Sequence, residues 1–237
     1  MEMIYGDDYL SPGGQETSTS LSELGQIRRA SKVLDLGSGL GGAAFFLNQS
    51  FACSVDGFDL MAANVAEANR RAEVYQISKL VAFSVGDATQ LPIDDCQYQV
   101  IWGQDAWCHI DSKESLISEA HRMLKPGGTI VFSDWLLLDS DAKHVKDVTA
   151  SPNMCDASHY QVLLSSNGFD AIRYIDTSAT YTTRYQDVLS RLHNLQEEIT
   201  KRFGNHVFDI VLSKQECVRD AFESGALGAG YFAAQKP

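Results

Sequence analysis

The stretch Val33-Leu34-Asp35-Leu36-Gly37-Ser38-Gly39-Leu40-Gly41-Gly42 runs from an apolar segment into a turn with glycines at alternate positions. Glycine adopts positive φ and has no Cβ, so the backbone of such a turn can contact a ligand directly. The G-x-G-x-G spacing differs from the G-x-G-x-x-G of dinucleotide-binding proteins. We therefore predict a cofactor site at Gly37, Ser38 and Gly39, with Asp35 organising the turn or holding a bound amino group.

On both sides of this turn, short β-rich segments alternate with amphipathic ones, which is typical of a parallel sheet covered by helices. Strands are expected at residues 32–36, 54–58, 80–84, 98–102, 129–133, 171–175 and 230–234. Helices are expected at residues 41–49, 61–74, 113–124, 157–166, 185–202 and 214–222. The pattern predicts an α/β fold with a doubly wound, mostly parallel, seven-stranded sheet and a small helical cap.

The domain organisation that we expect is one domain over residues 1–237. Residues 1–30 would form an N-terminal lid segment, because they precede the first strand. Residues 135–156 are polar and irregular and are expected to be an insertion, and residues 177–228 are expected to form the helical cap.

Further carboxylates follow the second and third expected strands, at the sheet edge where such folds bind ligands. Asp59, followed by Leu60, is placed to accept hydrogen bonds from both hydroxyls of a ribose. Asp87 can accept a hydrogen bond from the amine of adenine, with Ala88 against the ring. The alternative is that Asp59 and Asp87 only cap the helices that follow them. Their register with the glycine turn favours the cofactor interpretation.

The glycine turn, the acidic end of strand two, the segment Gly86–Pro92 and the segment Leu124–Thr129 occur in this order along the chain. In these features the sequence resembles the class I S-adenosylmethionine-dependent methyltransferases, which have a Rossmann-like fold. The resemblance implies S-adenosylmethionine as cofactor and S-adenosylhomocysteine as product. It also adds Ser11 and Gln104 to the expected cofactor contacts.

A narrower resemblance begins at Ile101-Trp102-Gly103-Gln104-Asp105-Ala106-Trp107-Cys108-His109-Ile110. This segment is similar to the small-molecule N-methyltransferases that make choline and betaine, including the phosphoethanolamine and the sarcosine/dimethylglycine methyltransferases. Residues 5–14 resemble the entry segment of the phosphoethanolamine group, and residues 228–236 resemble the last strand of both groups. The resemblance implies methyl transfer to the nitrogen of a small amine or amino acid, with His109 as the base.

The chemistry of methyl transfer supports these assignments. The methyl of a sulfonium is already electrophilic, so the enzyme must align a nucleophile with it and remove a proton. Asp105 and His109 are four residues apart and share a face if the chain is helical there. His109 titrates near neutral pH and is the candidate base, while Asp105 orients it or the amine. The alternative is that His109 packs at the start of a helix.

Several aromatic side chains are candidates for contact with the acceptor. Related enzymes imply a tyrosine partner for the histidine, and Tyr5 or Tyr9 is expected to take this place unless the histidine acts alone. Trp107 and Trp135 could enclose a methylated cation, although large apolar side chains more often belong to the core. Tyr181 lies in the expected cap and could stack on a small polar substrate.

The expected insertion differs from that of the phosphoethanolamine enzymes. Those enzymes carry tyrosine and arginine after the fifth strand to receive the substrate phosphate. Residues 135–155 contain neither residue type here, only Lys143, His144 and Lys146 as candidate cations. The sequence therefore argues against recognition of a phosphobase.

Composition excludes several classes of partner. The formal net charge of -12 disfavours a nucleic-acid surface, which requires clustered cations. The 5 cysteines are scattered without C-x-x-C spacing, so we expect neither a disulfide framework nor a zinc site, and a reducing cytoplasm fits best. We expect no signal peptide and no membrane span. Methyl transfer from a sulfonium needs no metal, and the expected partner is a small-molecule acceptor.

Three alternatives remain at this point. An O- or S-methyltransferase of secondary metabolism uses the same cofactor turn. A non-catalytic S-adenosylmethionine-binding protein would keep the fold but has no need of a base at His109. A nicotinamide-dependent oxidoreductase is disfavoured by the spacing of the glycines.

Overall fold

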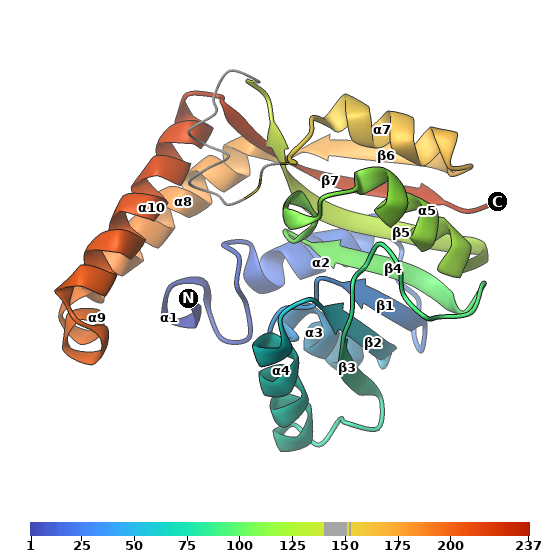
Figure 1. The fold of residues 1–237 in the computed structure, drawn as a ribbon, viewed down its shortest axis with the longest axis horizontal. Helices are drawn as coiled ribbons and strands as arrows, with labels where there is room; N and C mark the ends of the chain where they lie inside the picture. Colours follow the sequence, from blue (N-terminus) through green and yellow to red (C-terminus); the bar gives the residue numbers. More distant parts are fainter. Residues whose placement is uncertain (140–150, 152) are drawn as a thin grey trace.

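The computed structural model describes residues 1–139, 151 and 153–237. Within these residues, seven strands form a single sheet in the order β3-β2-β1-β4-β5-β7-β6 (Figure 1). Strands β1 to β5 pair in parallel, whereas β7 is antiparallel to both β5 and β6. The predicted fold class is confirmed. The strands are β1 Lys32–Leu36, β2 Ser54–Asp59, β3 Val81–Val85, β4 Tyr98–Gln104, β5 Leu124–Leu137, β6 Asp170–Asp176 and β7 Leu227–Gln235.

Helices cover both faces of this sheet, because alternate residues of its buried strands point to opposite sides. Val33 of β1 packs with α2, α3 and α4 on one face, and Leu34 packs with α5 and α7 on the other. The helices of these layers are α2 Gly14–Leu24, α3 Gly42–Phe51, α4 Ala62–Val74, α5 Lys113–Met123 and α7 Ala157–Ser166.

Strand β5 is longer than the sequence predicts, at both ends. It begins at Leu124 rather than Thr129, because the backbone around Gly127 and Gly128 exchanges hydrogen bonds with Lys236. It ends at Leu137 and so includes Trp135, which was expected in the insertion. Residues 140–150 and 152 lie outside the described part of the chain, so Lys143, His144, Lys146 and most of the expected insertion are not described.

The cap helices lie within the predicted residues 177–228, but they extend beyond the predicted helices at 185–202 and 214–222. Helices α8 (Ser178–Asn194) and α10 (Asn205–Glu223) run side by side away from the sheet, with the short α9 (Gln196–Phe203) at their tip (Figure 1). The start of α8 is rich in serine and threonine, whose helix propensity is low, and this hid its first turns from sequence analysis. Tertiary packing compensates, because Tyr181 and Tyr185 of this segment are fully buried.

The N-terminal residues lie between the cap and α4 (Figure 1). They form the short helix α1 (Glu2–Tyr5) and then continue to α2. Ile4 belongs to the apolar cluster of the cap, with Leu192 and Phe208. No helix among residues 1–139, 151 and 153–237 combines the length and apolar character that a membrane span requires.

Candidate active site

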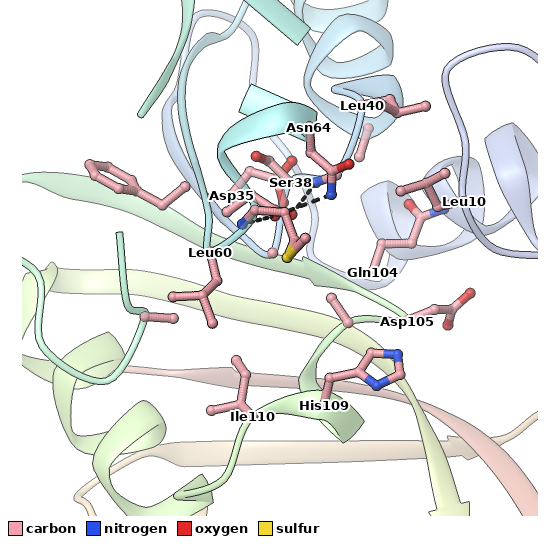
Figure 2. Close-up of a pocket in the computed structure, with 18 of the residues that line it drawn as sticks. Leu10, Asp35, Ser38, Leu40, Leu60, Asn64, Gln104, Asp105, His109 and Ile110 are labelled. Atoms are coloured by element: carbon pink, nitrogen blue, oxygen red, sulfur yellow. Dashed lines mark hydrogen bonds between the residues drawn. The ribbon is translucent and has the colours of Figure 1, made fainter. Parts of the chain in front are cut away.

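A cavity of about 520 Å³ opens at the carboxyl ends of β1, β2 and β4, where the topology of such sheets places ligands. Figure 2 shows His109 and Asp105 on one side of it, opposite Asp35, Ser38 and Asn64. All the residues predicted to bind the cofactor line this cavity. They are Ser11, Asp35, Gly37, Ser38, Gly39, Asp59, Leu60, Asp87, Ala88 and Gln104.

The glycine turn is held against the end of β2. The backbone N–H groups of Gly37 and Ser38 both donate to the carbonyl of Phe58, at 2.8 and 3.0 Å. Gly37 has φ of 84°, which favours glycine. A Cβ at this position would also lie 2.5 Å from the Cβ of Ala106, so the turn passes directly beside the end of β4.

The carboxylate of Asp59 accepts hydrogen bonds from the backbone and also lines the cavity. Its Oδ2 accepts a hydrogen bond from the Gly39 N–H at 2.8 Å, which ties it to the glycine turn. Its Oδ1 accepts from the Met61 N–H at 2.8 Å and from Asn64 Nδ2 at 3.2 Å. Asp59 thus contacts the first residues of α4 but does not cap this helix, whose N-cap is Met61 without a side-chain hydrogen bond. A carboxylate offers about four acceptor positions in all, so capacity for ribose hydroxyls remains.

Asp87 likewise forms local hydrogen bonds and lines the cavity. Its Oδ1 accepts from the backbone N–H and the hydroxyl of Thr89, at 2.9 and 2.7 Å, and this forms a local turn. The turn places Asp87 and the largely buried Ala88 on the wall of the cavity. The apolar side chains of Leu60, Met61 and Ile110 line the same cavity and supply a surface against which an aromatic ring can pack.

Among the acidic groups that line the cavity, Asp35 has the pKa that is shifted most from its ordinary value. It is buried, and burial together with the negative charge of Asp59 raises its pKa to about 7. Its Oδ2 and the hydroxyl of Ser38 are buried without a hydrogen-bond partner in the described part of the protein. Buried polar atoms are rarely left unpaired, so both fit a ligand that brings its own hydrogen-bonding groups.

Gln104 joins β4 to the start of α2. Its Nε2 donates to the carbonyl of Gly14 at 2.8 Å, and its Oε1 accepts from the hydroxyl of Ser18 at 2.7 Å. Tyr9 adds to this contact, since its hydroxyl lies 3.1 Å from that of Ser18. Gln104 thus closes the side of the cavity and keeps the N-terminal segment next to it.

Asp105 and His109 both line the cavity, but not through the expected helical register. Asp105 has φ of 52°, and only a short 3-10 helix, η1 (Trp107–His109), follows. The Oδ1 of Asp105 accepts hydrogen bonds from Ser133 at 2.7 Å and from Tyr181 at 2.5 Å. Its Oδ2 is buried without a partner in the described chain. The expectation of a shared helix face is therefore wrong, although the two side chains still meet at one cavity.

His109 is positioned by groups on both sides of its backbone. Its Nδ1 lies 2.8 Å from the hydroxyl of Ser151. Asp134 holds the 3-10 helix from behind, since its Oδ1 accepts from the Cys108 N–H at 2.8 Å and its Oδ2 from the Tyr160 hydroxyl at 2.6 Å. Burial raises the pKa of Asp134 to about 6. Sequence analysis missed Asp134, which lies one strand away from the residue it supports.

The predicted acceptor-binding aromatics fall into different places. Tyr9 lines the cavity. Trp107 does not, because it is fully buried, donates to the Leu36 carbonyl at 3.0 Å and stacks on Phe132, so it is a core residue. Tyr5 bonds Gln215 of the cap.

Trp135 and Tyr181 are not among the residues that line the cavity. The ring of Trp135 packs edge-on against Tyr185 and Phe222, and Tyr181 stacks on Phe222. Tyr181 still reaches the site through its hydrogen bond to Asp105. The aromatic side chains of the cap and Trp135 of β5 thus form one cluster, and Tyr181 connects this cluster to Asp105.

The cavity also contains residues that sequence analysis did not identify. Asn64 of α4 bonds Asp59, and its position five residues later, at the start of the expected helix, was a usable signal. Leu10, Met61 and Ile110 line the cavity as well. Single apolar residues carry no signal of this kind, because their types are common everywhere in a globular protein.

Comparison with known proteins agrees with this geometry. Residues 34–132 match the family described as methyltransferase domain. The chain is 27% identical over 240 residues to phosphoethanolamine N-methyltransferase 1 of Zea mays, covering 99% of this chain and 47% of the relative. It is 28% identical over 185 residues to a glycine/sarcosine/dimethylglycine N-methyltransferase of Actinopolyspora halophila, covering 75% of this chain and 32% of the relative. The chain thus spans about half or less of the length of these relatives.

A solved structure shares the fold over the whole chain. Phosphoethanolamine N-methyltransferase 2 of Haemonchus contortus, in complex with phosphomonomethylethanolamine and S-adenosylhomocysteine, superposes with a TM-score of 0.93. The superposition covers 100% of this chain and 56% of the other, at 22% sequence identity. This likeness establishes the fold.

The close approach of Gly37 to Ala106 predicts a large loss of stability in Gly37→Ala. We expect the free energy of unfolding to fall by about 2–4 kcal/mol, through strain at positive φ and overpacking against Ala106. Gly127→Ala is the matched control, because Gly127 also has positive φ but a Cβ there has no neighbour within 4 Å. It should lose about 1 kcal/mol. Equal losses in urea unfolding would show that contact with Ala106 does not constrain the turn.

Proposed function

We propose that this chain, which carries a methyltransferase domain over residues 34–132, transfers a methyl group from S-adenosylmethionine to the nitrogen of a small amine or amino acid. The observation that carries the proposal is the meeting of two groups of residues at one cavity. Asp35, Asp59 and Asp87 form one wall, and Asp105 and His109 form another. The relatives, of which this chain spans half or less, support the same chemistry for small amines.

The residues of the first wall suit the cofactor. Asp59 would accept from the ribose hydroxyls, and Asp87 from the amine of adenine, with the ring against Leu60 and Ala88. The unpartnered oxygen of Asp35 would receive the amino group of the methionine part. When bound, the cofactor supplies a methyl group on a positively charged sulfur, which is electrophilic without further activation.

The residues of the second wall suit an amine acceptor. The buried Oδ2 of Asp105 has no partner in the described chain and would accept a hydrogen bond from an ammonium or amine. His109 lines the cavity with its Nδ1 held 2.8 Å from the hydroxyl of Ser151, and an imidazole is a group that can accept a proton near neutral pH. His109 would deprotonate the ammonium, and Asp105 would hold the resulting amine for attack on the methyl carbon.

A panel of acceptors tests the proposal. The protein is incubated with S-adenosylmethionine and with glycine, sarcosine, dimethylglycine, phosphoethanolamine, or small thiols and alcohols, and release of S-adenosylhomocysteine is measured. We expect release with one or more amines. Release only with thiols or alcohols would replace the proposal by an O- or S-methyltransferase. Cofactor binding without turnover on any acceptor would favour a non-catalytic binding protein.

His109→Ala should abolish most of the turnover while leaving the cofactor site intact. General base catalysis contributes about 10²–10⁴-fold, so we expect kcat to fall by that factor. The dissociation constant of S-adenosylhomocysteine, measured by calorimetry, should stay within about twofold of the parent value, since the substitution leaves the first wall in place. His206→Ala, on the exposed face of α10, is the control. An unchanged kcat in His109→Ala would remove this residue from the mechanism.

The raised pKa of Asp35 predicts a pH-dependent affinity for the cofactor product. Below pH 7 the carboxyl is neutral and cannot form an ion pair with the ligand's ammonium. S-adenosylhomocysteine should therefore bind about tenfold more weakly at pH 6 than at pH 8. The difference should disappear in Asp35→Asn and persist in Asp94→Asn, whose residue is exposed. Calorimetric titration at both pH values provides the measurement, and an equal pH dependence in Asp35→Asn would contradict the assignment.

The raised pKa of Asp35 has the opposite pH dependence for the stability of the ligand-free protein: its contribution is favourable at low pH and is lost at high pH. Because the folded state keeps the Asp35 proton to a higher pH than the unfolded state does, folding is stabilised most at low pH. This contribution to the free energy of unfolding is lost as the pH rises from about 4 to about 7. Ligand binding above pH 7 therefore acts on a carboxylate whose burial is otherwise unfavourable.

A further inference from the structure

The first residues of the chain, 1–11, form a segment that we name the strap. It connects α4, the cofactor cavity and the helical cap. Its last residues, Asp8, Tyr9, Leu10 and Ser11, line the cavity. The strap therefore forms part of the wall of the site, although it belongs to no layer of the sheet.

Arg71 of α4 binds the strap through charge-assisted hydrogen bonds. Its guanidinium forms a two-pronged ion pair with Glu2, with one contact at 2.9 Å, and Nη1 donates to Asp8 at 2.7 Å. Nε donates to Glu67 of its own helix at 2.8 Å, which fixes the guanidinium plane. Its side chain is only 14% exposed. Bidentate pairs of this type are stronger and more directional than ordinary surface ion pairs.

The charge balance at this point depends on Arg71. The carboxylates of Glu2, Asp8 and Glu67 all contact its guanidinium. The hydrogen bond from Arg71 lowers the pKa of Glu2, because the guanidinium favours the ionised carboxylate. Without the guanidinium, like charges would face one another, and the electrostatic force on the strap would change from attraction to repulsion.

Asp8, which Arg71 binds, is followed directly by Tyr9 and Leu10, which line the cavity. The carbonyl of Asp8 accepts the Gly42 N–H at 3.2 Å, at the start of α3. A Cβ on Gly42 would lie 2.9 Å from the ring of Tyr9, and one on Gly39 would lie 3.4 Å from Leu10. Tyr9 and Leu10 are thus packed directly on the glycine turn, and a displacement of Asp8 would move them away from it.

The other end of the strap is held independently by the cap. Arg191 of α8 donates to the Ile4 carbonyl at 2.6 Å, and Tyr5 donates to Gln215 of α10 at 3.0 Å. Without Arg71, only the Tyr75 hydroxyl and the Gly42 N–H would still bind Asp8 from outside the strap in the described chain. Loss of Arg71 would therefore weaken the cofactor side of the strap while leaving its cap side attached. This makes Arg71 the residue whose removal tests the cofactor side alone.

We propose that Arg71 is a positioning residue for the cofactor: it holds the strap closed against the glycine turn and thereby limits the rate at which the cofactor leaves. The inference rests on the proposed function, since it concerns the same cavity. Arg71 does not line that cavity, and it acts only through Glu2 and Asp8.

The dissociation rate of S-adenosylhomocysteine measures this role without requiring turnover. In stopped-flow displacement, Arg71→Met should release the ligand at least about tenfold faster than the parent protein. Arg70→Met is the matched control, because the neighbouring Arg70 bonds Glu67 on the exposed face and does not contact the strap. Its dissociation rate should match that of the parent within about twofold. The parent rate should also rise with salt concentration, and that of Arg71→Met should not.

Glu2→Gln provides a second route if Arg71→Met fails to fold. This substitution weakens the same contact from the strap, at a terminal helix of four residues, and leaves α4 intact. It should raise the dissociation rate in the same direction. Equal dissociation rates for the parent, Arg71→Met and Glu2→Gln would overturn the inference while leaving the proposed function standing. Failure of the parent protein to bind the ligand would overturn both.

Discussion

The carbonyl of Phe58 receives two adjacent N–H groups of the glycine turn, and most of the site is arranged around this contact. It joins the end of β1 to the end of β2, so the turn cannot rotate without breaking two hydrogen bonds. Asp59, the next residue, then reaches back to the Gly39 N–H. The same short segment thus fixes the turn and presents a carboxylate to the cavity. Parallel pairing of β4 on the other side of β1 brings Ala106 against Gly37 and carries Asp105 and His109 to the same edge.

Buried acidic groups are concentrated at this edge of the sheet. Asp35, Asp105 and Asp134 are each nearly inaccessible, and the hydrogen bonds to Asp105 and Asp134 come from hydroxyls and a backbone amide rather than from cations. Burial of a carboxylate without a paired cation is unfavourable, and the raised pKa values of Asp35 and Asp134 express that cost. A ligand that carries positive charge relieves part of it. The interior of this site is therefore suited to cationic groups, because it presents buried carboxylates and supplies no cation of the described chain to pair with them.

Sequence analysis was most informative where one physical requirement dominates. Buried parallel strands are almost continuously apolar, so Lys32–Leu36 was predicted with its observed bounds, and alternate glycines before a helix identified the turn. The cofactor-binding candidates follow from the topology, because the ends of neighbouring parallel strands meet. Those candidates do line one cavity, although the individual ligand contacts remain predictions.

The failures have equally specific causes. Asp105 takes a left-handed conformation without being glycine, so its backbone gave no warning that the helical spacing to His109 would not apply. The positions of Trp107 and Trp135 depend on packing between segments distant in sequence, and residue type does not distinguish a core tryptophan from one at a binding site. In the sequence, Arg71 looks like an ordinary arginine on a helix surface, because its partners Glu2 and Asp8 are distant in sequence. Asp134 supports the segment of His109 from the neighbouring strand β5, through the Cys108 N–H, and no local pattern records this relation.

The place of β7 in the sheet has a consequence for how the protein is made. Residues 227–235 lie between β5 and β6, and β6 has no other neighbour in the described sheet. During synthesis the ribosome therefore delivers β6 and the whole cap before the strand that will pair them with the rest of the protein. Until then β6 presents unpaired backbone groups on both edges, which is the state most exposed to wrong pairing with another chain. Contacts of such large sequence separation also form slowly. Pairing of β6 with the rest of the sheet therefore has to wait for residues 227–235, and only their pairing tethers the cap to the sheet at both of its ends.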